Sequence, residues 1–398
     1  MKRIAFALLA LSLGGALAFG QDAPAAAAPV VTIGDWGRQI FSVGNLTAKE
    51  APDGAAGNYA GVGTSWSGNA RIVGLNIQAK TDTVGFSITP QDDNGTFGLT
   101  DQNKAWINPM PGLQFESGIS LETDTWRGTA DYGSWDWLRF QGTAGDSFTF
   151  QRLGEGGVAT DINYNKDGVG AWALWQSGPN ASSTQAQNQS PATQLQIGAA
   201  YLVPSVGTIK AQYIGNNVPK NGLIGTQAKA ASTSGVVNAA FNFIGMENLY
   251  EEVGIYVPTA ASDVGYTLQA MDYTTYKMDK TTLHLQVGLA LPQTDNGGDS
   301  GLALMGGVGA DYDLGDSLAV SGDIRYNNAN ALDGDLKTVP ANLGNGMTGF
   351  LVDLTKGFSN GDIGIGFEYT TITFGGEVPG SDTSAGHWAI PIRAEEWF

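Results

Sequence analysis

Residues 281–291 read Thr-Thr-Leu-His-Leu-Gln-Val-Gly-Leu-Ala-Leu, and this stretch decides the fold. Leucine or valine occupies every second position from 283 to 291, and small or polar residues lie between them: Thr282, His284, Gln286, Gly288 and Ala290. Such alternation puts the apolar side chains on one face of a β-strand and the others on the opposite face. A helix would need a period of 3.6, which the mature chain does not show convincingly.

The same alternation recurs along the chain. It predicts strands at 386–398, 362–373, 347–356, 317–326, 301–312, 280–291, 264–273, 248–257, 235–243, 206–214, 193–203 and 168–176. Upstream the pattern is less distinct, and it predicts strands near 156–164, 146–153, 134–141, 117–126, 105–115, 82–90, 69–79 and 31–43. Towards the C-terminus the connections between these strands alternate between long and short.

This alternation in length is typical of barrels with short periplasmic turns and long outer loops. We therefore predict an all-β fold, an antiparallel up-and-down transmembrane β-barrel of about 16–20 strands, with 18 as the central estimate. Residues 31–398 would form this single barrel domain. If the last strand ends in the periplasm, every long connection falls on the outer side.

The N-terminus predicts export from the cytoplasm. Lys2 and Arg3 precede an apolar run from Ile4 to Phe19, and Ala18-Phe19-Gly20 supplies small residues for cleavage before Gln21. These features indicate a signal peptide at 1–20, followed by a flexible Ala/Pro-rich terminus at 21–30. No later stretch is long and apolar enough for a spanning helix.

Composition limits the classes of partner and chemistry. The net charge of −18 disfavours nucleic acid as a partner and favours cations. The chain has no cysteine, so disulfides, thiolate metal sites and a lipoprotein anchor are excluded. The 10 Trp, 13 Tyr and 16 Phe argue against disorder over the whole chain.

The C-terminal strand carries a recognisable pattern. Apolar side chains alternate along it and an aromatic residue ends it: Trp388, Ile390, Ile392 and Phe398. This tail resembles the terminal strand of bacterial outer-membrane barrel proteins of porin type, and the resemblance implies recognition by the barrel-assembly machinery. The leader end and the tail also resemble those of spirochaete outer-membrane proteins. Pro391 departs from the pattern, because proline lacks an amide donor, and we expect it at a bulge or at the closing seam.

With the apolar positions facing outer-membrane lipid, the alternate residues would line a water-filled lumen. The candidate lumen-lining residues are Gln78, Arg139, Gln141, Lys210, Gln212, Glu252, His284, Gln286, Asp323, Arg325, Glu368 and Arg393. Such charged groups would tune ion selectivity, or would simply be solvated. Aromatic residues near strand ends are candidates for the interfacial girdles: Trp175, Tyr201, Tyr213, Tyr256 and Tyr326.

Two motifs resemble catalytic or cofactor-binding sequences, but neither is followed by the helix that such a site requires. Gly357-Phe-Ser359-Asn-Gly361 matches a nucleophile elbow in letters, but it joins two predicted strands and ends in a hairpin dipeptide. Gly344-Asn-Gly346-Met-Thr-Gly349 likewise precedes a strand instead of a helix. We predict no enzyme activity, no cofactor and no metal centre.

Acidic connections could hold Ca²⁺ through oxygen ligands, although solvated loop tips explain them as well. The two stretches are Asp92-Asp93-Asn94 and Asp295-Asn296-Gly-Gly-Asp299, and neither has EF-hand spacing.

The sequence thus favours a porin-like channel for passive diffusion of small hydrophilic solutes or ions, with a weak preference for cations. Two alternatives stay open. One is a surface adhesin that binds through long outer loops, and the other is a secreted soluble β-sandwich that binds a ligand. A homo-oligomer is possible for the channel and for the adhesin.

Overall fold

A computed structural model describes residues 28–47, 57–62, 71–93, 95–99, 103–119, 158–176, 195–215, 235–259, 266–292, 302–327, 346–373 and 384–397. The predicted signal peptide, strands 134–141 and 146–153, the acidic stretch 295–299 and Phe398 lie outside these residues. In the described residues all regular structure is β. None of their segments is a helix long and apolar enough to cross a membrane.

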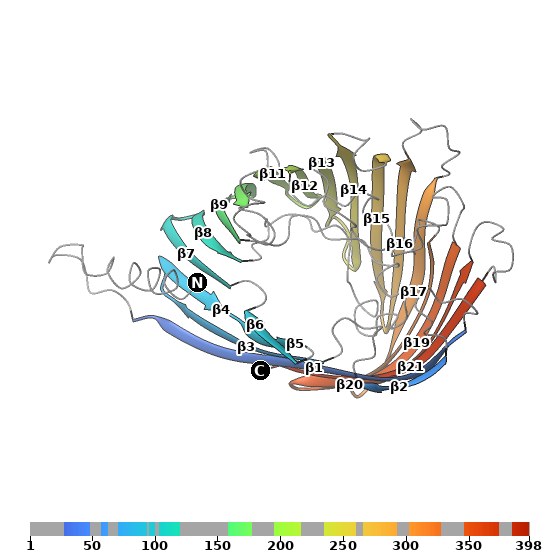
Figure 1. Ribbon diagram of the computed structural model, residues 1–398. Helices are drawn as coiled ribbons and strands as arrows, with labels where there is room; N and C mark the ends of the chain where they lie inside the picture. Colours follow the sequence, from blue (N-terminus) through green and yellow to red (C-terminus); the bar gives the residue numbers. More distant parts are fainter. Residues whose placement is uncertain are drawn as a thin grey trace, which may run out of the picture.

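The strands follow one another in sequence order around a single sheet (Figure 1). In the first half they are β1 (Val30–Thr47), β2 (Gly57–Val62), β3 (Arg71–Lys80), β4 (Val84–Ile88), β5 (Pro90–Asp93), β6 (Thr96–Leu99), β7 (Asn103–Met110), β8 (Leu113–Ile119), β9 (Val158–Lys166), β10 (Val169–Gln176) and β11 (Leu195–Val203). In the second half they are β12 (Gly207–Ile214), β13 (Val236–Phe243), β14 (Leu249–Pro258), β15 (Tyr266–Met278), β16 (Thr281–Pro292), β17 (Ala303–Gly315), β18 (Leu318–Asn327), β19 (Gly346–Phe358), β20 (Gly361–Thr373) and β21 (Ser384–Trp397).

The sheet closes on itself. β1 pairs antiparallel with β21 from Trp36↔Trp397 to Thr47↔Gly386. Three positions in the wall are each shared by two segments, β2 with β3, β4 with β5, and β6 with β7, so the 21 segments make an 18-stranded barrel. The predicted antiparallel barrel and its central strand number are confirmed, and the β-sandwich alternative is wrong because there is one closed sheet.

The two rims of the barrel differ in their connections. One rim carries both strand termini, Val30 and Trp397, together with short turns such as residues 167–168, 279–280, 316–317 and 359–360. Asp167 and Gly168 have φ of 54° and 81°, and Asp316 and Ser317 have φ of 51° and 59°. Positive φ at both central residues suits two-residue hairpins because it matches the strand twist. The other rim carries the long connections, except for the short link between β5 and β6.

The two faces of the wall have opposite chemistry. On the outer face, Leu285, Val308, Ile324 and Phe350 lie opposite one another across β16–β19, and they are 42–56% exposed. Their neighbours in sequence are buried polar groups, including Gln286, Asp323 and Arg325. A soluble protein would expose the polar face, so this inverted pattern is that of a barrel surrounded by lipid.

Some predicted strands are corrected. Residues 105–115 form a hairpin rather than one strand, since β7 and β8 meet at a turn in which Gly112 has φ of 85°. The strand expected at 82–90 ends at Ile88, and β5 begins at Pro90. The stretch 117–126 contributes only the end of β8, and the residues after Ile119 lie outside the described ranges. Weak alternation in this glycine- and proline-interrupted region explains these errors.

Pro391 lies at the closing seam, opposite Ser42 of β1. On its other side, Pro391 faces β20, where pairing is interrupted between Ile365↔Ile392 and Glu368↔Ala389. The register is the same before and after this interruption. Of the two expected places, the seam is therefore correct and the bulge is not. An interruption in pairing without a bulge is the local effect of a residue that has no backbone N–H.

Candidate channel interior

The inward face of the wall is rich in polar side chains. Most of the candidate residues are buried there: Gln212, Glu252, His284, Gln286, Asp323, Arg325, Glu368 and Arg393. Gln78 and Lys210 are half-buried on the same face, whereas Arg139 and Gln141 lie outside the described residues. Burying polar groups is costly unless they find partners, so the contacts they make decide what this interior can do.

The wall formed by β15–β19 carries the densest charge. The guanidinium of Arg325 donates to both carboxylate oxygens of Asp323, from Nε at 3.1 and 3.0 Å and from Nη2 at 2.8 Å. The two residues are two apart on one strand, so their side chains share a face. This forked geometry is the strongest form of the Arg–carboxylate contact.

His284 joins two other strands of the same wall. Its Nε2 lies 2.7 Å from Asp311 Oδ2, and its Nδ1 lies 3.3 Å from the hydroxyl of Tyr273. His284 and Tyr273 are 4% and 2% exposed. The imidazole is held by both ring nitrogens, so it acts as a fixed bridge between β15 and β17.

Asp353 adds a carboxylate to the same wall. It lies in one cross-strand row with Ser321 and Asp311, and Thr355 Oγ1 donates to its Oδ1 at 3.4 Å. Its other oxygen, Oδ2, has no hydrogen-bond partner among the described residues. The charge of Asp323 is balanced by its bidentate contact with Arg325. The acidic character of this wall therefore comes from Asp311 and Asp353.

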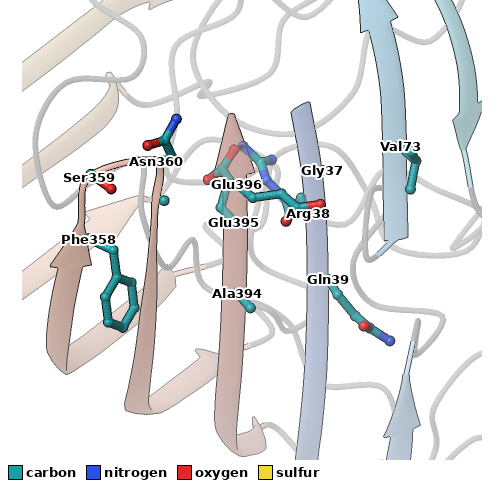
Figure 2. A pocket seen from close by; sticks show the side chains of 11 residues that line it. Gly37, Arg38, Gln39, Val73, Phe358, Ser359, Asn360, Ala394, Glu395 and Glu396 are labelled. Atoms are coloured by element: carbon teal, nitrogen blue, oxygen red, sulfur yellow. Dashed lines mark hydrogen bonds and ion pairs between the residues drawn. The ribbon is translucent and has the colours of Figure 1, made fainter. Parts of the chain in front are cut away.

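The seam between first and last strands has an ion-pair cluster. Arg38 of β1 donates from Nη2 to Glu395 Oε1 of β21 at 3.1 Å, and Arg393 Nη2 contacts the other oxygen of Glu395. Figure 2 shows Arg38 and Glu395 beside each other, with the β19–β20 turn at Ser359 and Asn360 nearby. At the short-turn rim, a cavity of about 500 Å³ is lined by residues of β1, of β21 and of the β19–β20 turn.

The wall formed by β9–β15 differs, because most of its inward polar groups are amides. Gln196, Asn238 and Gln269 are 0–1% exposed, and Trp172 and Tyr256 are buried beside them. Its carboxylates are Asp161 and Glu252. Asp161 accepts a hydrogen bond from Asn163 Nδ2 at 2.6 Å, and Glu252 accepts one from the hydroxyl of Tyr250 at 2.7 Å. Gln196, Asn238, Trp172 and Asp353 are not among the predicted lumen-lining residues, although the same alternation places them on the inward face.

The C-terminal and aromatic candidates divide between the two faces. Trp388 and Ile392 are exposed on the outer face, and Ile390 of the same face is half-buried. Trp175, Tyr201 and Tyr326 are 46%, 54% and 41% exposed near strand ends, as a girdle requires, and Tyr213 is half-buried. Tyr256 is 1% exposed and faces inward, so its assignment to a girdle is wrong. Ile255 and Val257 take the outward positions on that strand.

The motifs considered for chemistry lie in or beside strands and their turns, and residues 346–349 of the dinucleotide-like motif are the beginning of β19. Ser359 and Asn360 form the short turn between β19 and β20, which no helix follows. Asp92 Oδ1 accepts the backbone N–H of Gly95 at 2.8 Å within the β5–β6 turn. In the part of the chain that the structure describes, no group of three His, Asp or Glu side chains has a geometry for metal binding.

A closed 18-stranded antiparallel barrel with an apolar outer belt and a polar interior is a transmembrane β-barrel of the outer-membrane porin type. No known family profile matches this sequence, and no curated protein matches it either. Among solved structures, it is similar to OmpT, an outer membrane protein of Vibrio cholerae, in a loop L8 deletion mutant, with 12% identity and a TM-score of 0.47 over 94% of this chain and 100% of that one. It is also similar to a mutant of the porin of Rh. blastica, with 13% identity and a TM-score of 0.48 over 93% and 100%. Identities and scores this low carry no function across, so the class rests on the strands and their faces.

Proposed function

We propose that the protein is an outer-membrane channel through which small hydrophilic solutes and ions diffuse passively. The observation that carries this proposal is the inverted chemistry of the wall. Apolar side chains such as Leu285 and Ile324 point outward, while Gln286 and Arg325 beside them point inward. An interior of 18 strands is wider than one that side chains can fill, so a polar lining supports a water-filled path.

A preference for cations follows from the charges of this lining. Interior basic groups lie against carboxylates on the same or a nearby strand, as in Arg325–Asp323, Arg393–Glu395 and Lys104–Glu116. Asp353 has no such basic partner among the described residues, and Asp161 shares Lys104 with Glu116. The remaining charge is negative, which raises the local concentration of cations.

The test is conductance in a planar lipid bilayer under a salt gradient. Detergent-purified protein, shown by heat-modifiable gel migration to be folded, should produce stepwise current. The sign of the reversal potential should correspond to faster passage of the cation. A silent bilayer containing inserted, folded protein would overturn the channel and would favour adhesion by the outer loops.

Export and assembly belong to the same proposal. The leader at 1–20 would direct secretion, and the last strand would be read by the barrel-assembly machinery through Trp388, Ile390, Ile392 and Phe398. Deleting Phe398 should reduce the folded fraction in the outer membrane without preventing export, as followed by cell fractionation and heat-modifiable migration.

A further inference from the structure

The first strand continues past the end of the last one at the short-turn rim. β1 pairs with β3 from Val30 onward, whereas its pairing with β21 begins only at Trp36↔Trp397. Only one residue follows Trp397 in the chain, so residues 30–34 have no neighbour from β21 over a strand length of about 17 Å. Figure 1 shows this part of β1 running on beyond the C-terminus. The closed sheet therefore has a short open edge at its seam.

The backbone groups of this edge have a defined direction. The N–H of Trp397 donates to the carbonyl oxygen of Asn360 at 3.1 Å, so the hydrogen bonds of Trp397 point to β20. Successive residues of an antiparallel strand direct their N–H and C=O groups to opposite neighbours. The residue before Trp397 therefore faces β1, opposite Gly37, and Gly37 faces it in return. Two and three alternations farther along β1, Ile33 and Val31 direct their N–H and C=O groups to the open side.

The side chains of this edge are apolar and lie beyond the apolar belt. Val31 and Ile33 are 58% and 69% exposed on the outward face. The outward carboxylates of Asp35 and Glu396 separate them from the belt, and charged groups are unfavourable where the outer face meets hydrocarbon. Native edges are protected from pairing by lysine, proline or a bulge, and residues 30–34 have none of these. This edge is therefore open to pairing in water.

The cavity of about 500 Å³ described above lies where this edge meets the last strand. Gly37, Phe358 and Glu396 line it from the outward face. The Glu396 carboxylate lies across Gly37, since a Cβ atom there would be 3.3 Å from its Oε1, and Figure 2 shows the two residues side by side. Asp35 is two residues from Gly37 on the same face, so a second carboxylate lies nearby. The cavity has room for the stem of a basic side chain whose charged group meets these carboxylates.

We propose that residues 30–34 are a docking edge for an extended segment of a periplasmic protein, which adds to β1 as an antiparallel strand in line with β21. Strand addition takes its affinity from main-chain hydrogen bonds and its specificity from side-chain pockets. The segment would place aliphatic side chains at alternate positions beside Val31 and Ile33. The residue before them leaves the wall, because β21 occupies it, and a lysine or arginine there would reach the cavity beside Glu396.

A second copy of the chain does not fit this edge. In the same membrane its β1 runs in the same direction as this one, whereas the pairing used throughout the wall is antiparallel. The inference rests on the proposed outer-membrane placement, with the short turns in the periplasm. It goes beyond the proposed function because docking does not require that solutes pass through the barrel.

The experiment measures peptide binding to the folded protein in lipid nanodiscs, which leave both rims accessible. The probe is a fluorescent peptide in which a lysine precedes alternating valine and threonine residues, and binding is followed by fluorescence anisotropy. A second peptide carries N-methyl groups on its valine amides, which removes the main-chain donors without changing the side chains. Saturable binding of the first peptide, at least tenfold tighter than that of the second, is the expected result.

Variants of the chain locate the binding. Ile33→Pro removes an N–H group from the open edge, where proline is tolerated in a strand, and should weaken binding about tenfold. Ile33→Val is the matched control and should bind as the wild type does. Glu396→Gln should weaken binding about threefold, but only for a peptide that has lysine rather than norleucine at its start. Heat-modifiable gel migration confirms that each variant is folded.

Equal binding of the two peptides would overturn the docking edge, as would wild-type binding by folded Ile33→Pro or no saturable binding up to about 1 mM peptide. If Ile33→Pro instead reduces self-association of the protein in detergent, the edge belongs to a second copy and the proposal is wrong. Bilayer current is recorded separately from the same preparations. Peptide binding can therefore fail while the channel stands, and a silent bilayer leaves the binding result intact.

Discussion

Arg38 and Glu395, which are 357 residues apart in sequence, face each other across the seam where the barrel closes, with Nη2 and Oε1 3.1 Å apart. Arg38 belongs to the first strand and Glu395 to the last, so this ion pair can form only when the ends of the chain have met. Both side chains are mostly buried, at 19% and 15% exposed. A contact of this kind should contribute to closure more than an exposed surface pair would.

Replacing Arg38 with Met should weaken closure. The variant removes the charge but retains most of the apolar stem, which leaves the Glu395 carboxylate with Arg393 alone. We expect a loss of about 1 kcal/mol in the free energy of unfolding and an earlier transition on heated gels. Gln39→Ala is the control, because Gln39 is an exposed neighbour on the opposite face. Equal transitions for both variants would mean that the pair contributes nothing to closure.

Much of the second half of this fold is predictable from sequence. From β9 onward each predicted strand matches an observed one to within a few residues; the strand expected at 362–373, for example, is β20 at Gly361–Thr373. Alternation is strong there because the outward positions must all be apolar, and the short turns carry residues that accept positive φ. The residues that face inward follow from the same alternation, because they occupy the positions between the apolar ones.

The sequence alone does not predict which inward side chains contact one another across strands. Arg38 and Glu395, or His284 and Asp311, lie on different strands, and their contact depends on register as well as parity. The inward row that runs from Asn163 on β9 to Gln269 on β15 could not be assembled from sequence for the same reason, since its members come from seven strands. In the first half the pattern fails because β4 and β5 are short segments separated by a single residue, Thr89.

Asp353→Asn should reduce the preference for cations. The substitution removes one negative charge from the β15–β19 wall and keeps the shape of the side chain and its contact with Thr355. We expect the cation-to-anion permeability ratio, taken from the reversal potential, to fall by about twofold. Asp272→Asn is the matched control, because it makes the same charge change on the outward face of β15, between the buried Met271 and Tyr273. A twofold fall in the control as well would show that net charge, not the wall, determines selectivity.

Gly198→Ala should destabilise the barrel through the Trp172 ring. The new methyl group would overlap the indole, so the ring or the strand must move, and we expect a loss of about 1–3 kcal/mol. Gly98→Ala is the control, since nothing lies within 4 Å of a Cβ there. Urea unfolding followed by tryptophan fluorescence compares the two. Adding Trp172→Ala to Gly198→Ala should cost less than the sum of the single changes, and strict additivity would contradict direct contact.

Ile324→Lys tests whether the exposed apolar face meets lipid. Ile324 is 53% exposed near the middle of the row formed by Leu285, Val308 and Phe350. In water an exposed Ile-to-Lys change is nearly neutral, whereas a lysine on the lipid face of a barrel is destabilising by about 2–4 kcal/mol near the bilayer midplane. Urea-dependent unfolding from lipid vesicles should therefore shift strongly for Ile324→Lys and hardly at all for Ile324→Leu. The same pair compared in short-chain detergent should show a smaller difference, because detergent adapts to a buried charge more readily than a bilayer does. Unchanged stability of Ile324→Lys in vesicles would mean that this face is covered by something other than lipid.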